Sequence, residues 1–101
     1  MKPSYYCGTY TGDGAAQNIM IGFEPHYVRI VNITDRDQIV EWFSDMPNGE
    51  GVQTAAAVGT LAANGVSLYT GTRGGDSAGF TAGTAVSENG KTYAFIAMRG
   101  D

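Results

Sequence analysis

Short apolar segments with the periodicity of β-strands, separated by glycine and proline turns, recur along this chain. In the segment Asn18–Phe23, the residues Ile19, Ile21 and Phe23 fall on one face by the two-residue period of a strand. Pro25 then ends the segment, because proline has no backbone N–H to donate to a ladder. Turn signals spaced at roughly 8 to 12 residues are typical of antiparallel sandwiches and barrels. The pattern predicts an all-β fold, an antiparallel β-sandwich or small barrel of about seven or eight strands, with room for one short helix.

The clearest expected strand is Tyr27–Thr34, whose β-branched residues leave apolar groups on both faces. Two apolar faces are typical of a strand in the middle of a fold, so we expect neighbours on both sides of it. The sequence Glu88-Asn89-Gly90-Lys91 predicts a type I′ hairpin turn joining the last two strands. The other expected strands are Tyr5–Thr11, Asn18–Phe23, Phe80–Val86 and Thr92–Met98.

Two segments leave the choice between helix and strand open. In residues 35–46, Ile39, Trp42, Phe43 and Met46 recur at helical spacing, but the same letters also alternate as a strand. We favour the strand, with residues 34–37 as a hairpin turn, because the rest of the chain is β. Residues 53–63 are small and repetitive, and they fit either a short helix or a weak pair of strands.

The length of 101 residues fits a single domain, because domains cluster at roughly 100 to 150 residues. Large apolar side chains gather near the two ends, whereas residues 47–91 are rich in alanine, glycine and threonine. This middle looks underfilled by itself, and we expect it to gain from contact with a neighbouring molecule. The first four residues, Met1–Ser4, are interpreted as an N-terminal arm.

The charge of the chain restricts its partners. A formal net charge of -4 and a pI near 4.7 argue against nucleic acid, since phosphate-binding proteins gather Lys and Arg on one face. No apolar run approaches the ~20 residues of a membrane-spanning helix, so no membrane partner is expected. The single Cys7 cannot form an internal disulfide, and no secretory leader opens the chain, so we expect synthesis and folding in a cytoplasm.

One short motif suggests an enzyme, but the rest of the chain does not support it. Gly75-Asp76-Ser77-Ala78-Gly79 resembles the nucleophile loop of chymotrypsin-type proteases, and His26 would be its only base. That mechanism needs a Ser-His-Asp triad held between two barrels, and this chain is under half the usual length. A flexible loop explains the same residues, so we expect no enzymatic activity and no catalytic residues.

Cofactor and metal sites are not expected either. Asn89-Gly90-Lys91-Thr92 ends like a phosphate-binding loop, yet a strand follows it where that motif needs a helix. Asp35 and Asp37 are the best candidates for a weak oxygen-ligand metal site, but a turn accounts for both.

Several stretches of the sequence resemble small β-rich virion structural proteins of tailed bacteriophages. The resemblance rests on Gly-Thr-Tyr-Thr-Gly-Asp-Gly at 8–14 and Ile-Gly-Phe-Glu-Pro-His-Tyr-Val-Arg-Ile-Val-Asn at 21–32. Residues 41–43, 79–84 and 90–93 fit it as well, so it covers most of the chain. It implies a virion part, either a capsid decoration (cement) protein or a module of a tail fibre. The size of the chain favours decoration.

A decoration protein is expected to lie on the capsid surface of the virion and to stabilise the head by bridging neighbouring subunits. The expected partners are the major capsid protein and further copies of the chain itself, as a trimer or another cyclic homo-oligomer. The alternative is a tail-fibre or receptor-binding module that contacts the host surface. Exposed aromatics and the small-residue middle supply the expected assembly interface, which consists of Tyr5, Tyr6, Trp42, Ala55, Ala56, Ala57 and Leu61.

Overall fold

The computed structural model describes residues 5–55, 57–71 and 78–99, and in them the chain is all-β, as predicted. Eight strands and one 3-10 turn make up the regular structure of these residues. The elements are β1 (Tyr5–Thr11), β2 (Gln17–Met20), β3 (Tyr27–Asn32), β4 (Ile39–Phe43), β5 (Glu50–Thr54), β6 (Val58–Tyr69), β7 (Gly79–Ala82), η2 (Thr84–Val86) and β8 (Thr92–Met98).

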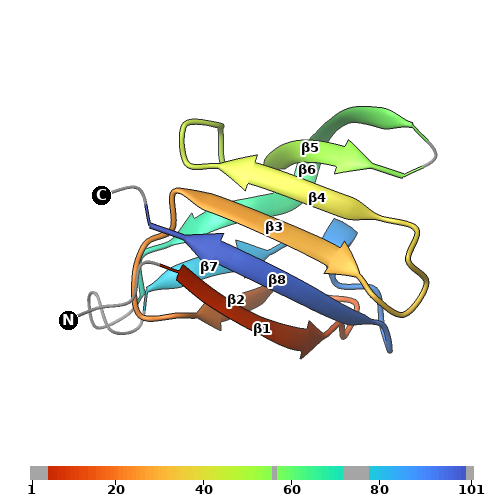
Figure 1. Cartoon of the computed structure of the whole chain (residues 1–101), viewed down its shortest axis with the longest axis horizontal. Coiled ribbons are helices and arrows are strands. Elements are labelled where there is room, and N and C mark those ends of the chain that lie inside the picture. The colour runs from red at the N-terminus through yellow and green to blue at the C-terminus, as the bar shows by residue number, and fades with distance from the viewer. Residues whose placement is uncertain (1–4, 56, 72–77, 100–101) are drawn as a thin grey trace.

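The strands form one antiparallel sheet in the order β1-β8-β3-β4-β5-β6-β7-β2. The sheet curls over itself, so that β1, β8, β3 and β4 form a front layer and β6, β7 and β2 lie behind it (Figure 1). Its two outermost strands, β1 and β2, are consecutive in the sequence. Each of them has a single ladder neighbour among the described strands, so the curled sheet has two free edges.

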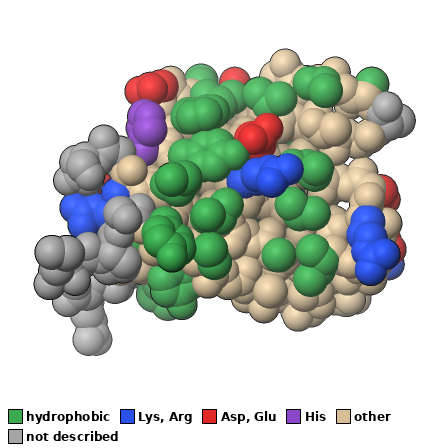
Figure 2. Space-filling view, viewed as in Figure 1, with side chains coloured by type: hydrophobic (Ala, Val, Ile, Leu, Met, Phe, Trp, Pro, Cys, Tyr) green, Lys and Arg blue, Asp and Glu red, His purple; other side chains and the backbone are tan. Residues whose placement is uncertain are grey.

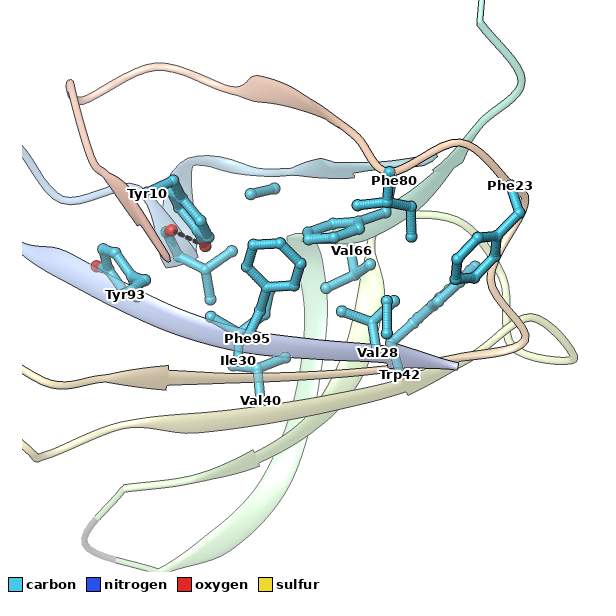
Figure 3. Close-up of a cluster of buried hydrophobic side chains, with 14 residues drawn as sticks. Tyr10, Phe23, Val28, Ile30, Val40, Trp42, Val66, Phe80, Tyr93 and Phe95 are labelled. Atoms are coloured by element: carbon cyan, nitrogen blue, oxygen red, sulfur yellow. Dashed lines mark hydrogen bonds between the residues drawn. The ribbon is translucent and has the colours of Figure 1, made fainter. Parts of the chain in front are cut away.

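The core lies between the two layers (Figure 3). It is built by the alternate residues of each strand that point inward. Trp42, Tyr93 and Phe80 are the largest fully buried side chains. Phe80 of the back layer meets Phe95 of the front layer edge to face, with ring centroids 5.2 Å apart. The Phe80–Phe95 contact therefore joins the two layers. Burial of each large apolar side chain contributes about 1.5–3 kcal/mol to the stability of the fold.

The strand assignments for 27–34 and 35–46 are confirmed in type, and β3 pairs with both β8 and β4. The turn expected at 34–37 is also present. Arg36 adopts a left-handed φ of 58° in it, and the buried Asn32 accepts hydrogen bonds at its Oδ1 from the backbone N–H groups of Thr34 and Asp35. Asn32 thereby fixes the bend between β3 and β4.

The sequence leaves the segment 53–63 open between helix and strand, and its described residues, 53–55 and 57–63, belong to the hairpin of β5 and β6. The small side chains at its tip bury little, and Val58 is 72% exposed. Leu61 is the exception, because it packs against the core. Part of the middle that looked underfilled is therefore a projecting hairpin, whereas Val66, Phe80 and Val86 of the same stretch are fully buried in the core.

The prediction for the last hairpin is wrong. The expected strand Phe80–Val86 ends as β7 at Ala82 and continues as the turn η2, and β8 pairs with β1 and β3 rather than with β7. A type I′ turn needs positive φ at Asn89 and Gly90, but only Gly90 has it, at 82°. Long-range packing decides the course of this segment, since Val86 is fully buried and its carbonyl accepts the Tyr10 hydroxyl at 2.8 Å.

The second strand is shorter than expected, because β2 ends at Met20 and Gly22 bends the chain with a φ of 91°. The expected common face of Ile19, Ile21 and Phe23 is nevertheless directed to the core, against which all three pack. The expected N-terminal arm, Met1–Ser4, lies outside the described residues.

Candidate docking surface

The solvent side of the front layer carries mostly apolar side chains, although it lies opposite the core (Figure 2). We call this surface the outer face. It is defined by the outward residues of five adjacent strands, which are Tyr5, Cys7, Tyr27, Arg29, Val31, Ile39, Glu41, Phe43, Val52, Ala94, Ile96 and Met98.

The ladder registers arrange these side chains in rows across the strands. One row runs Cys7, Ile96, Arg29, Glu41 and Val52, in the order β1, β8, β3, β4 and β5. The next row runs Tyr5, Met98, Tyr27 and Phe43. Directly opposed residues stand about 4.5–5.5 Å apart at Cβ, so each row is a continuous strip of touching side chains.

An apolar outer face is unusual for an antiparallel sheet, in which one face normally packs on the core and the other is polar. Phe43, Val52 and Met98 are exposed on it, and Tyr27, Val31, Ile39 and Ile96 are only partly covered by one another. Exposed apolar patches with a polar centre or rim mark interaction sites on soluble proteins. The residues of the outer face therefore form the strongest candidate site on the described part of the chain.

A polar trio lies within this apolar face. The Tyr27 hydroxyl donates to Glu41 Oε2 at 2.7 Å, and Arg29 Nε stands 3.9 Å from the same oxygen. Desolvation by burial, followed by the hydrogen bond to Glu41, raises the pKa of Tyr27 to about 12. Because the contact of Arg29 is long and its side chain is half-exposed, its N–H donors are available to an acceptor on another molecule.

A shallow hollow of about 210 Å³ opens beside Arg29 on the outer face. It lies between β3 and β8 and is lined by Arg29, Val31, Ala94, Phe95 and Ile96. One apolar side chain of a partner fits a hollow of this size and lining, with the guanidinium at its rim. The arrangement is typical of a protein interface, where an apolar anchor is framed by an Arg.

The residues predicted for the assembly interface divide into three groups. Tyr5 and Tyr6 are exposed, at 56% and 43%, and Tyr5 lies on the outer face. Trp42 is corrected: it is 1% exposed, and its Nε1 donates to Pro47 O inside the fold, so it is a core residue. Trp42 is buried because its neighbours in β4, Glu41 and Phe43, point outward, so Trp42 points to the opposite face, into the core.

The other predicted interface residues belong to the β5–β6 hairpin, away from the outer face. Ala55 and Ala57 are exposed at its tip, Ala56 lies outside the described residues, and Leu61 is partly buried on the core. Sequence reasoning missed Tyr27, Phe43 and Met98 as surface residues. The signal was present in the strand at 27–34, whose apolar residues on both faces indicate a covered outer side as well as a buried inner one.

The residues considered for chemistry lie apart from one another. His26 contacts Ser44 Oγ at 2.7 Å and Asp45 at 3.9 Å, at an exposed corner of the front layer. Ser77 lies outside the described residues, so the structure does not place the protease-like motif. Where residues are described, no group of three or more His, Cys, Asp or Glu side chains could hold a metal ion.

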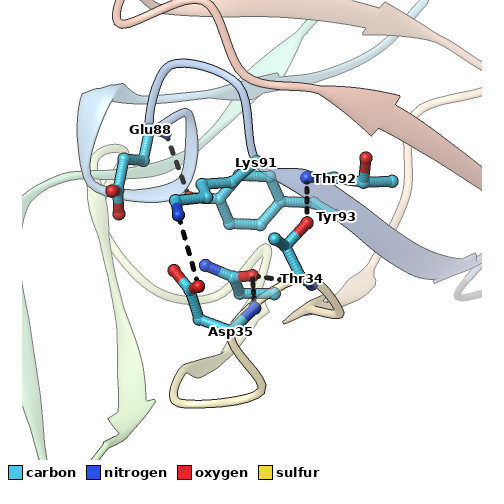
Figure 4. Close-up of polar contacts among 7 residues, drawn as sticks. Thr34, Asp35, Glu88, Lys91, Thr92 and Tyr93 are labelled. Carbon is cyan, nitrogen blue, oxygen red and sulfur yellow. Dashed lines mark hydrogen bonds and ion pairs between the residues drawn. The ribbon is translucent and has the colours of Figure 1, made fainter.

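Asp35 forms an ion pair with Lys91 at 3.2 Å, in the turn where a metal site was considered (Figure 4). The hydrogen bond to Asp35 raises the pKa of Lys91. Both residues of the pair are therefore engaged with each other. The P-loop-like letters 89–92 accordingly form a turn and the start of β8, and not a helix N-terminus.

Among the helices that the structure describes, none has the length and apolar character to cross a membrane. Comparison of the chain with models of protein families, with curated proteins and with solved structures finds no match.

Proposed function

We propose that this chain is a virion structural protein of a tailed bacteriophage, a capsid decoration protein that docks on the major capsid protein through its outer face. The observation that carries the proposal is the apolar outer face, which places Tyr5, Phe43 and Met98 in solvent on the isolated chain. Covering these side chains removes apolar area from water, which stabilises a complex by about 25 cal/mol per Å² before the costs of association.

The resemblance to small phage virion proteins supplies the partner, and the architecture suits the role. A sheet whose two layers pack on each other and whose outer face is apolar can bridge two subunits without rearranging. The acidic balance of the chain is compatible with a protein partner and unfavourable for packaged nucleic acid. Each bound copy stabilises the assembled shell by mass action, because it binds the assembled state and not free subunits.

The test is to add the purified chain back to heads that lack it and to measure how much cosediments. Phe43→Glu places a charge at the β4 end of the second row, and we expect it to weaken binding by at least about tenfold, the effect of losing a hot-spot residue. Met20→Glu is the matched control, because Met20 is 60% exposed but belongs to β2 in the back layer. Equal binding of both variants and the wild type would refute docking through the outer face.

The second candidate, a receptor-binding module of a tail fibre, is favoured by the aromatic pair on the same face. Tyr27 and Phe43 have ring centroids 4.9 Å apart, and such rings can stack on a sugar. A glycan array and binding to intact host cells distinguish the two roles. A decoration protein is expected to be silent in both assays, whereas a receptor-binding module gives a signal that Phe43→Glu removes.

A further inference from the structure

The edge of β1 that faces away from β8 has no ladder partner among the described strands. The hydrogen bond from Gly12 N to Lys91 O, at 2.8 Å, continues the β1–β8 ladder. It shows which alternate residues of β1 direct their backbone groups to β8. In an antiparallel pair, alternate residues direct their backbone groups to the neighbour. Tyr6, Gly8 and Tyr10 therefore bond to β8, whereas Tyr5, Cys7, Thr9 and Thr11 direct their N–H and C=O groups away from it.

We propose that β1 pairs with β1 of a second copy of this chain, antiparallel and about a two-fold axis at Cys7. The pairing joins two sheets into one through main-chain hydrogen bonds. It goes beyond the role on the capsid, because it assigns a self-association that the isolated chain carries by itself.

The edge lacks the features that normally prevent such pairing. Edge strands are protected by charged side chains, proline, bulges or short length. β1 has seven residues, Tyr-Tyr-Cys-Gly-Thr-Tyr-Thr, with no charge and no proline, and its register with β8 is unbroken. The other free edge, β2, has only four residues and ends at the bend of Gly22. Of the two edges, β1 is the one suited to pairing.

Charge favours a second copy as the occupant. The chain carries a net charge of -4, so most contacts between copies bring like charges together. β1 is neutral, and a two-fold axis that opposes it to itself brings no carboxylates into the strand pair. An antiparallel pair of identical strands also matches each outward residue with another outward residue, so the outward N–H groups of Tyr5, Cys7 and Thr9 meet acceptors.

A side-chain contact fixes the register. Gln17 Nε2 donates to Thr11 O at 2.8 Å, which occupies the outward carbonyl at the end of β1. Among the described residues of β1, the segment left free runs from Tyr5 to Thr9, and its centre is Cys7. In this register Cys7 opposes Cys7 of the second copy, and Tyr5 opposes Thr9. Tyr5 and Cys7 belong to the rows of the outer face, so the two outer faces become one continuous surface.

The oligomeric state of the full-length chain tests the pairing without any capsid. Sedimentation equilibrium is expected to show a dimer for the wild type, and Thr9→Lys is expected to raise the dissociation constant at least about tenfold by placing a charge at the free edge. Met20→Lys, on the other edge, is the control and should leave the constant unchanged. Circular dichroism establishes that both variants fold. A wild type that stays monomeric throughout, or a dimer that Thr9→Lys leaves intact, overturns the proposal.

Oxidation tests the register. Directly opposed residues have Cα atoms about 5.5 Å apart, within the range of a disulfide. Diamide, which takes up the two hydrogens that two Cys7 thiols lose, is expected to join the wild-type chains covalently. In a variant with Cys7→Ser and Thr9→Cys the two thiols lie four residues apart along the strands, roughly 13 Å, and no disulfide should form. Cross-linking through position 9 and not through position 7 would refute the axis at Cys7, and the docking function would be untouched.

Discussion

Tyr27 and Glu41 form a 2.7 Å hydrogen bond in the outer face, between adjacent strands β3 and β4. The bond stands among apolar side chains, and desolvation by burial together with this bond raises the pKa of Tyr27. A partner that covers the outer face therefore meets a phenol whose hydroxyl already has its hydrogen-bond acceptor. This lowers the cost of removing the face from water.

The raised pKa of Tyr27, caused first by burial and then by this hydrogen bond, predicts a loss of stability at alkaline pH. The pKa of Tyr27 is raised from 10.0 to about 12 in the folded chain, so between these values the folded state retains a proton that the unfolded state has lost. The contribution is complete below pH 10 and disappears as the pH rises towards 12. We expect Tyr27→Phe to make the fall in unfolding free energy across this window shallower, as measured by urea denaturation at each pH. Tyr5→Phe is the control for loss of an exposed phenol, and an unchanged profile for Tyr27→Phe would contradict the assignment.

A second tyrosine hydroxyl holds η2 to the core. Tyr10 donates to Val86 O at 2.8 Å in a buried position, and its ring stacks on Tyr93 with centroids 5.2 Å apart. Tyr10→Phe keeps the stack and leaves the carbonyl without its donor, so we expect a loss of about 1–3 kcal/mol in unfolding free energy. Tyr6→Phe, on the same strand but half-exposed, should change it by less than about 0.5 kcal/mol. Thermal and urea denaturation compare the two, and equal losses would argue against a structural role for the Tyr10 hydroxyl.

The sequence could predict the strands in which apolar residues alternate most regularly between the two faces. In β3 the residues Val28 and Ile30 point inward and Val31 outward, so the alternation and the apolar outer face are both visible in the letters. What local pattern cannot supply is which face of β4 is buried. Trp42 and Phe43 are both large and apolar, and only the pairing of β4 with β3 and β5 decides that Trp42 enters the core.

The segment after β7 shows the limit of local reasoning more clearly. The letters from Glu88 to Lys91 favour a hairpin, but the strand before them stops because Gly83 lies against the backbone of Asn64 and Gly65. A side chain at 83 would collide with those atoms, and they are distant in the sequence. Contacts of this kind override turn propensity and leave no signal in a short window.

A glycine in β7 is predicted to be important for the stability of the fold. A Cβ atom at Gly79 would collide with the backbone oxygen of Ile19 and come within 3.1 Å of the backbone nitrogen of Ile21. Backbone atoms cannot yield without parting β2 from β7, so Gly79→Ala should cost about 1–3 kcal/mol or more. Gly59→Ala is the matched control, because a Cβ there meets no described atom within 4 Å. It is expected to be neutral or to stabilise by about 0.4–1 kcal/mol, and a reversed order in urea denaturation would contradict the strand pairing.

The turn between β3 and β4 allows a buried hydrogen-bond acceptor to be compared with a surface ion pair. Asn32 Oδ1 accepts from the backbone N–H groups of Thr34 and Asp35, both at 3.0 Å, whereas Lys91 pairs with Asp35 at 3.2 Å near the surface. Asn32→Ala removes the shared acceptor, and we expect a loss of about 1–3 kcal/mol in unfolding free energy. Lys91→Met removes only the ion pair, so we expect a smaller loss, which falls further in high salt.

Asn32→Asp tests whether the accepting oxygen alone accounts for the effect of the Asn32 side chain. It retains an oxygen for the two backbone N–H groups, so it should recover part of the stability that Asn32→Ala loses. Urea denaturation of the three variants at low and high salt measures both effects. If Lys91→Met were as damaging as Asn32→Ala at low salt and recovered at high salt, the turn would depend on charge, and the role given to the Asn32 amide oxygen would be wrong.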